Sequence, residues 1–169
     1  MRRHDTPPWV AKTQLAVLQY LAQAETLERV PGCIPKALEI VAQTKSELKA
    51  GRVPVEELLV AQRLSRELAG YKTPSPAARA ARQLVEIGKT VAPGQVMRFV
   101  FTRGKPGIWA YGCGEFDQKT LDVGKYEEFL ERAARTILDS FMLEPRRQND
   151  RGKEVLQLIT PSVFKEYFF

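Results

Sequence analysis

The sequence predicts a mainly α fold (α+β), a helical domain that carries one small β-hairpin. Apolar residues repeat with a helical period over about 20 residues near the C-terminal end. Two other segments with helical spacing are bounded by proline and glycine, and two short apolar runs flank a loop rich in glycine. The 169 residues are 44% hydrophobic and 27% charged, which suits one domain with a tail or at most two small units.

Two helices are expected in the first 51 residues. Asp5 or Thr6 is suited to cap the first helix, and Pro7-Pro8 to occupy its first turn. Its apolar positions are Val10, Leu15, Leu18, Leu21 and Ala22. Pro31-Gly32 is expected to break the chain, Pro35 to begin the second helix, and Gly51 to end it.

The middle of the chain contains one ambiguous segment, one helix and the hairpin. Residues 53–64 are compatible with a short helix from Glu56-Glu57 or with a buried strand at 58–60. Residues 77–87 are expected to form a helix that ends at Gly88. Strands are expected at 95–102 and 108–111, joined by the loop 103–107.

The most regular helix is expected from about Asp122 to Leu143, because apolar side chains keep one face through four turns. Pro145 is expected to end it. We therefore place a domain at residues 1–143 and a linker with an apolar, aromatic C-terminal tail at residues 144–169.

The charge of the chain points to a polyanionic partner. The net charge is +6 and the isoelectric point is about 9.4. Residues 58–92 carry six cations and two anions, so most of the excess lies in one fifth of the chain. The sequence has neither an apolar run of membrane-spanning length nor an apolar signal segment, and the protein is therefore expected in the cytoplasm without membrane contact.

We identify no catalytic residues and no metal site in the sequence. Gly112-Cys113-Gly114 lacks the Lys-Ser/Thr pair of a phosphate-binding loop. Two separated cysteines, Cys33 and Cys113, and the single histidine, His4, do not supply the clustered ligands of structural zinc. No cofactor is expected in this chain.

Residues 58–88 are the candidate binding segment. Gln62, Arg63, Ser65 and Arg66 offer donors ahead of Tyr71-Lys72, and a turn then leads into the helix at 77–87. Arg79 and Arg82 lie three residues apart on one helix face, among small alanines. Charge with hydroxyls and amides is typical of a surface that follows phosphates without reading bases. A solvated face of a helical domain is the alternative from charge alone.

The same segment resembles the thumb domain of family B DNA polymerases. The matching residues, in order, are Leu59-Val60, Leu64-Ser65-Arg66, Tyr71-Lys72, Pro76, Arg82-Gln83-Leu84, Gly88-Lys89 and Pro93-Gly94. Upstream, Arg2-Arg3-His4-Asp5 is similar to the family's entry into the thumb, although His4 replaces the usual Arg, and Val53-Pro54 also matches. Downstream, Asp122-Val123, Tyr126 and Ala134 to Leu138 look like the last thumb helix.

The resemblance implies a chain that grips primer–template duplex DNA and has no chemistry of its own. Carried over by position, the implied backbone contacts are Arg3, His4, Gln62, Ser65, Arg66, Tyr71, Lys72 and Arg82. Local charge adds Arg63, Ser75, Arg79, Arg103 and Lys105. The family's catalytic Mg²⁺ is expected in the palm of a larger partner chain that also carries the fingers and exonuclease. A split polymerase and an excised domain remain equally open.

The C-terminal residues 161–168 resemble a sliding-clamp-binding peptide, with Pro161 in place of the usual Gln. The implied anchors are Phe164, Tyr167 and Phe168. Packing of these rings on the domain itself or on a partner subunit is the alternative.

Three functions follow. The leading one is the thumb part of a family B DNA polymerase that supports processive synthesis by a palm-bearing partner. The second is a stand-alone, non-catalytic adaptor that links a partner protein or a sliding clamp to DNA. The third is an enzyme in its own right, for which the sequence offers no catalytic set.

Overall fold

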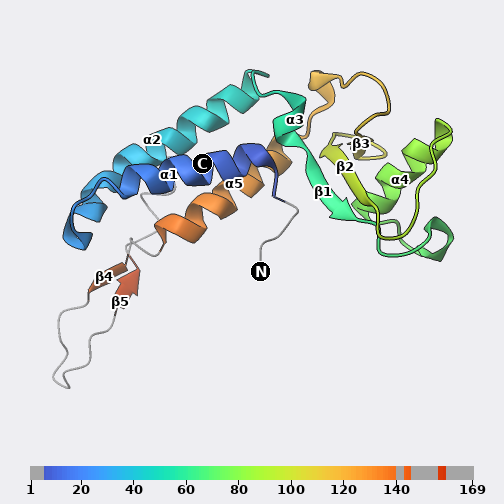
Figure 1. Cartoon of the computed structure of the whole chain (residues 1–169). Coiled ribbons are helices and arrows are strands. Elements are labelled where there is room, and N and C mark those ends of the chain that lie inside the picture. Colours follow the sequence, from blue (N-terminus) through green and yellow to red (C-terminus); the bar gives the residue numbers. More distant parts are fainter. Residues whose placement is uncertain (1–5, 140–142, 146–155, 159–169) are drawn as a thin grey trace. The chain divides into compact units, whose positions relative to one another are not determined.

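The computed structural model describes residues 6–139, 143–145 and 156–158 (Figure 1). Helices dominate these residues, with a small antiparallel sheet, so the mainly α (α+β) prediction is confirmed. The chain forms two compact units, one of Met1–Ala11 with Glu47–Tyr126 and one of Lys12–Ser46 with Glu127–Phe169. Among the described residues, no helix combines the length and the apolar character needed to cross a bilayer.

Helix α1 (Pro8–Leu21) begins at the predicted prolines but buries a different face. Trp9, Val10 and Val17 are buried, whereas Leu15 and Leu18 are 55% and 46% exposed. Of the apolar positions noted in the sequence, Val10 and Leu21 are thus buried, and Leu15 and Leu18 are not. Trp9, Val10, Val17 and Leu21 also follow a helical spacing, and the buried stripe runs along them.

Helix α2 (Val30–Lys49) begins earlier than predicted. It follows directly on the short 3-10 helix η1 (Leu27–Arg29). The predictions that Pro31-Gly32 breaks the chain and that Pro35 begins the helix were wrong, because both prolines lie within α2. Pro31 lies in the first helical turn, where its missing N–H has no partner to lose. Gly51 ends the helix as predicted, with φ of +67° and the paired hydrogen bonds Gly51 N to Leu48 O and Arg52 N to Glu47 O.

The ambiguous segment contains both predicted alternatives in succession. Helix α3 (Val55–Leu58) is followed by strand β1 (Val60–Arg63). Strand β1 pairs with β2 (Val96–Phe101), and β2 pairs with β3 (Ile108–Ala110), in the order β1-β2-β3. The predicted β2–β3 hairpin is confirmed, and β1 extends it to a three-stranded antiparallel sheet.

Helix α4 (Pro76–Glu86) packs on this sheet (Figure 1). Its buried side chains are alanines, which let the helix backbone come close to the strands. The Gln83 side chain donates to Ile108 O at 3.0 Å and accepts from Ala110 N at 2.8 Å, so it joins the helix to the free edge of β3. Gly88 ends the helix with φ of +83°.

Helix α5 (Val123–Leu138) follows the 3-10 helix η3 (Gln118–Thr120) and is capped by Asp122, whose carboxylate accepts from Lys125 N at 3.1 Å. The predicted end at Leu143 was wrong, because Leu143–Pro145 forms strand β4, which pairs with β5 (Leu156–Leu158). An extended residue is favoured ahead of Pro145, which fits a strand there.

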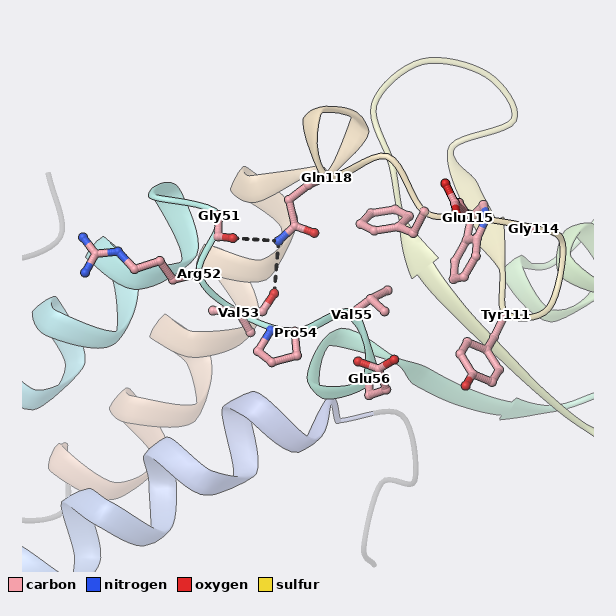
Figure 2. A pocket seen from close by; sticks show the side chains of 12 residues that line it. Gly51, Arg52, Val53, Pro54, Val55, Glu56, Tyr111, Gly114, Glu115 and Gln118 are labelled. Atoms are coloured by element: carbon pink, nitrogen blue, oxygen red, sulfur yellow. Dashed lines mark hydrogen bonds between the residues drawn. The ribbon is translucent and has the colours of Figure 1, made fainter.

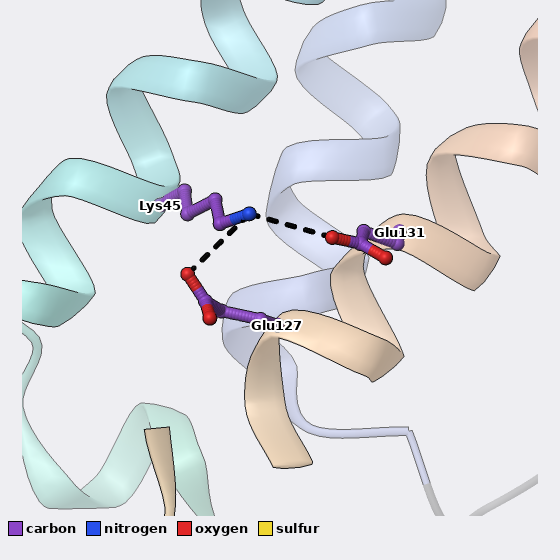
Figure 3. Close-up of polar contacts among 3 residues, drawn as sticks. All are labelled: Lys45, Glu127 and Glu131. Carbon is purple, nitrogen blue, oxygen red and sulfur yellow. Dashed lines mark hydrogen bonds and ion pairs between the residues drawn. The ribbon is translucent and has the colours of Figure 1, made fainter. Parts of the chain in front are cut away.

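In the second unit, side chains link α5 to α1 and α2. The Gln14 amide donates to Ala133 O at 3.3 Å. Lys45 Nζ lies 3.5 Å from Glu127 Oε1 and 3.4 Å from Glu131 Oε1, and these three side chains are 16%, 20% and 23% exposed (Figure 3). One cation therefore separates two partly buried carboxylates.

The variant Lys45→Met is expected to lower the free energy of unfolding by about 2 kcal/mol, because it removes the cation that lies between two partly buried carboxylates. Chemical denaturation measures this loss. The control Lys36→Met removes an ion pair with Glu39 whose partners are both more than half exposed, and a much smaller loss is expected there. Adding Glu131→Gln to Lys45→Met should restore part of the stability. Equal losses for Lys45→Met and Lys36→Met would contradict this account.

Candidate nucleic-acid interface

The candidate residues of the basic segment lie in one stretch between β1 and α4, in the first unit. We define the basic segment as residues 62–82. Gln62 and Arg63 end β1, Ser65 and Arg66 follow it, and Tyr71 and Lys72 come after the 3-10 helix η2 (Leu68–Gly70). Ser75 caps α4, which carries Arg79 and Arg82. The structure therefore places every predicted residue of this stretch on two short elements and their connecting loop.

Tyr71 folds the loop back on itself. Its hydroxyl accepts from Ser65 N at 3.0 Å and lies 2.9 Å from Ser65 Oγ. The Ser65 hydroxyl is also the main reason that the pKa of Tyr71 is lowered, since the hydrogen bond favours the phenolate. The Arg66 guanidinium carbon lies 5.4 Å from the centre of the Tyr71 ring. Tyr71 thus holds Ser65 and Arg66 in place, while Arg66 itself stays exposed.

The start of α4 uses its polar groups internally. The Ser75 hydroxyl accepts from Ala78 N at 3.2 Å, and Ser75 O accepts from Arg79 N at 2.9 Å. This is an ordinary N-cap, and it satisfies the Ala78 amide in the first turn of the helix. Ser75 therefore has a structural partner in this structure.

Arg79 and Arg82 differ in their surroundings although they lie three residues apart. Arg79 donates from Nη1 to Pro106 O at 2.6 Å and is half-buried, so it ties α4 to the β2–β3 loop. Arg82 is exposed. The contact between Arg79 and Pro106 holds the loop that carries Arg103 and Lys105, both exposed, beside α4.

The cations of this surface are available to a ligand. Arg63, Arg66, Lys72, Arg82, Arg103 and Lys105 are all exposed. Ion pairs within residues 6–139 join Arg29, Lys36 and Lys45 to glutamates, among others, and these six side chains take part in none there. Arg3 and His4 lie outside the described residues, as do Phe164, Tyr167 and Phe168.

The sequence reading missed Arg98, which is exposed on β2. In the antiparallel register Arg63 is opposite Val96, and Arg98 is opposite Ala61. Because side chains alternate along a strand, Arg98 shares the outer face of the sheet with Arg63. Arg98 stands alone among apolar residues in the sequence, and only the β1–β2 pairing places it beside Arg63.

The described residues contain no group of three or more His, Cys, Asp or Glu side chains that could hold a metal ion. Cys33 and Cys113 are free thiols, and partial burial raises the pKa of Cys113. The arrangement thus offers charge and hydrogen-bond donors on a surface.

Comparison with known proteins identifies the family of this fold. Residues 1–144 match the sequence pattern of DNA polymerase family B. The DNA polymerase of Thermococcus aggregans is 28% identical over 106 residues, which are 63% of this chain and 5% of that protein. The DNA polymerase of Thermococcus sp. (strain 9oN-7) is 30% identical over 99 residues, 56% of this chain and 13% of that protein. The match thus spans only a small part of each relative.

A solved structure shares the fold. The family B DNA polymerase from the hyperthermophilic archaeon Pyrobaculum calidifontis superimposes with a TM-score of 0.66 and 23% sequence identity. The superposition covers 79% of this chain and 18% of that one.

Proposed function

The chain belongs to DNA polymerase family B, and on this premise we propose that it is the thumb part of such an enzyme and grips primer–template duplex DNA through its backbone phosphates. The observation that carries the proposal is the set of exposed cations on the basic segment, which have no ion pair within the described residues. Positive charge without counter-ions attracts a polyanion, and neutralised phosphates release their condensed counterions.

The chemistry of the surface favours contacts to the backbone over contacts to bases. Three of the candidate polar side chains, Ser65, Tyr71 and Ser75, are held by hydrogen bonds within the chain. Apart from Gln62, the remaining donors are arginines and lysines on a short strand end, a loop and one helix. We infer that they fix the position of a duplex, and that its sequence is not read.

The proposal places catalysis on another polypeptide or on a preceding segment of the same one. The described residues offer no carboxylate cluster for the metal ions of nucleotidyl transfer, so they do not fit that role. A palm-bearing chain would be the partner, and the grip would raise its processivity. Primer extension by the purified chain alone would contradict the placement of catalysis outside it.

Binding of the purified chain to a fluorescent duplex of about 20 base pairs is expected to weaken steeply with salt. Six exposed cations would give a log–log slope of about 4–5 if most of them meet a phosphate, at about 0.9 per contact. Fluorescence anisotropy between about 50 and 300 mM KCl measures the slope. Two duplexes of unrelated sequence should bind within about twofold of each other. A flat salt dependence would refute the phosphate contacts.

An assay with a partner polymerase distinguishes the adaptor function from the thumb function. Addition of the chain to a family B polymerase that lacks this region should lengthen its products if the chain is a thumb. Clamp binding through Phe164, Tyr167 and Phe168 stays a prediction, and these residues lie outside the described ones.

A further inference from the structure

The first unit contains a pocket that the DNA grip does not use. Its volume is about 640 Å³, within the range of about 300–1,000 Å³ that is usual for ligand sites. One wall is the segment Gly51–Glu56, and the other is the loop that follows β3, from Trp109 to Gln118. None of the candidate phosphate contacts lines it. We call it the aromatic–acidic pocket.

The two walls are joined by one side chain. The Gln118 amide donates to Gly51 O at 3.3 Å and to Val53 O at 3.0 Å (Figure 2). Because the Gly51 end of α2 is also fixed by its own backbone hydrogen bonds, the pocket is formed before any ligand arrives.

Three aromatic rings form the apolar part of the pocket. The centroids of Trp109 and Phe116 are 5.1 Å apart with the ring planes at 52°, and those of Trp109 and Tyr111 are 6.1 Å apart at 85°. Trp109 thus lies beside both other rings, and all three line the pocket. Tyr111 is 43% exposed, so this ring cluster is open to solvent. A cation gains most when it sits within about 6 Å of such ring faces.

The charged lining has the sign that attracts a cation. Glu56 comes from the first wall and Glu115 from the second, and both are exposed. Arg52 is the only cation in the lining, and Figure 2 shows its side chain pointing away from the rings. Two carboxylates beside the rings oppose the phosphates of a nucleic acid, although exposed rings alone would suit base stacking.

From these contacts we propose that the aromatic–acidic pocket binds an arginine side chain presented by a basic segment of a partner polypeptide. A guanidinium group stacks on an aromatic ring and pairs with a carboxylate through its planar fork, which a lysine ammonium does not do. The site is independent of the phosphate-binding surface, and its test needs no duplex.

The test uses the full chain and the peptide acetyl-Gly-Arg-Gly-Arg-Gly-amide, with the same peptide containing citrulline as a neutral control of nearly equal shape. Two-dimensional NMR follows the two indole N–H signals, assigned with Trp109→Phe. The arginine peptide should shift the Trp109 signal until the shift saturates. The citrulline peptide should bind at least about tenfold more weakly. Trp9 is buried in the core, and its signal serves as the internal control.

The variant Glu56→Gln/Glu115→Gln keeps the shape of the pocket and should weaken the arginine peptide about fivefold or more. Glu67→Gln removes another exposed carboxylate, outside the pocket, and should change the Kd less than twofold. Binding that ignores Glu56→Gln/Glu115→Gln would overturn the proposal. The proposal would also fail if oligo(dT) shifted the Trp109 signal and bound more strongly to Glu56→Gln/Glu115→Gln than to the wild type. The rings would then bind a nucleic acid.

Discussion

Reversing the charge at both Arg66 and Lys72 (Arg66→Glu with Lys72→Glu) is expected to weaken duplex binding about 100-fold or more at low salt, since two charge-assisted contacts of about 1.5–3 kcal/mol each are lost. The log–log salt slope should fall by about 1.8, because two phosphates are no longer neutralised. Both side chains are exposed and take part in no ion pair within the described residues, so the fold should tolerate the change. Fluorescence anisotropy on the two unrelated duplexes measures both quantities.

The matched control is the reversal of Arg29 and Lys36, which alters the net charge equally outside the basic segment. Their side chains are 68% and 58% exposed and pair only with Glu25 and Glu39 on the surface. A loss of less than about fivefold is expected, because only the long-range field changes. Equal losses of affinity in both double variants would mean that binding depends on the net charge and not on the position of the cations. A loss confined to one duplex sequence would argue against backbone contacts.

The variant Tyr126→Phe is expected to lower the free energy of unfolding by about 2 kcal/mol. Tyr126 is fully buried. Its hydroxyl donates to Leu58 O at 2.7 Å and accepts from Phe101 N at 3.2 Å, so it connects α5 with the end of α3 and with β2. Phenylalanine fits the space but leaves the carbonyl and the amide without this partner. Urea denaturation at neutral pH measures the loss.

The same hydroxyl gives the stability a dependence on alkaline pH. Burial raises the pKa of Tyr126 above its usual value of about 10, so the folded protein keeps the proton that the unfolded chain releases. The contribution is complete below pH of about 10 and is lost as the pH rises above it. The difference in unfolding free energy between the wild type and Tyr126→Phe should therefore shrink above that pH.

Tyr111→Phe is the control for both measurements, because that ring is 43% exposed. It should change stability by less than about 0.5 kcal/mol. A Tyr126→Phe variant as stable as Tyr111→Phe would show that water replaces the lost hydrogen bonds.

Local sequence signals predicted the helix boundaries that are marked by capping residues. Asp122 begins α5, and Gly51 and Gly88 end their helices through positive φ angles. These signals act within a few residues, so no tertiary contact is needed to read them. The start of α2 was missed because two prolines lie within the helix, Pro31 in its first turn and Pro35 beyond it, and both were taken as signs of a boundary.

The parts that depend on distant partners were not predictable. Strand β1 forms because Val60–Arg63 pairs with Val96–Phe99, more than 30 residues away, and Arg98 was overlooked for the same reason. The charges of the candidate interface were evident from the sequence, but their roles were not. Arg79 donates a hydrogen bond to Pro106 O, 27 residues further along the chain. Only the structure shows that its surroundings differ from those of the exposed Arg82.

The contact of Gln83 with β3 has a consequence for how the protein behaves in a crowded solution. A strand at the border of a sheet offers its carbonyl and amide to any extended chain, including another copy of itself. Ile108 O and Ala110 N are the groups that such a chain would seek, and the Gln83 amide occupies both. The helix therefore closes the sheet at that border, and a domain with a three-stranded sheet is protected there against growing into an aggregate.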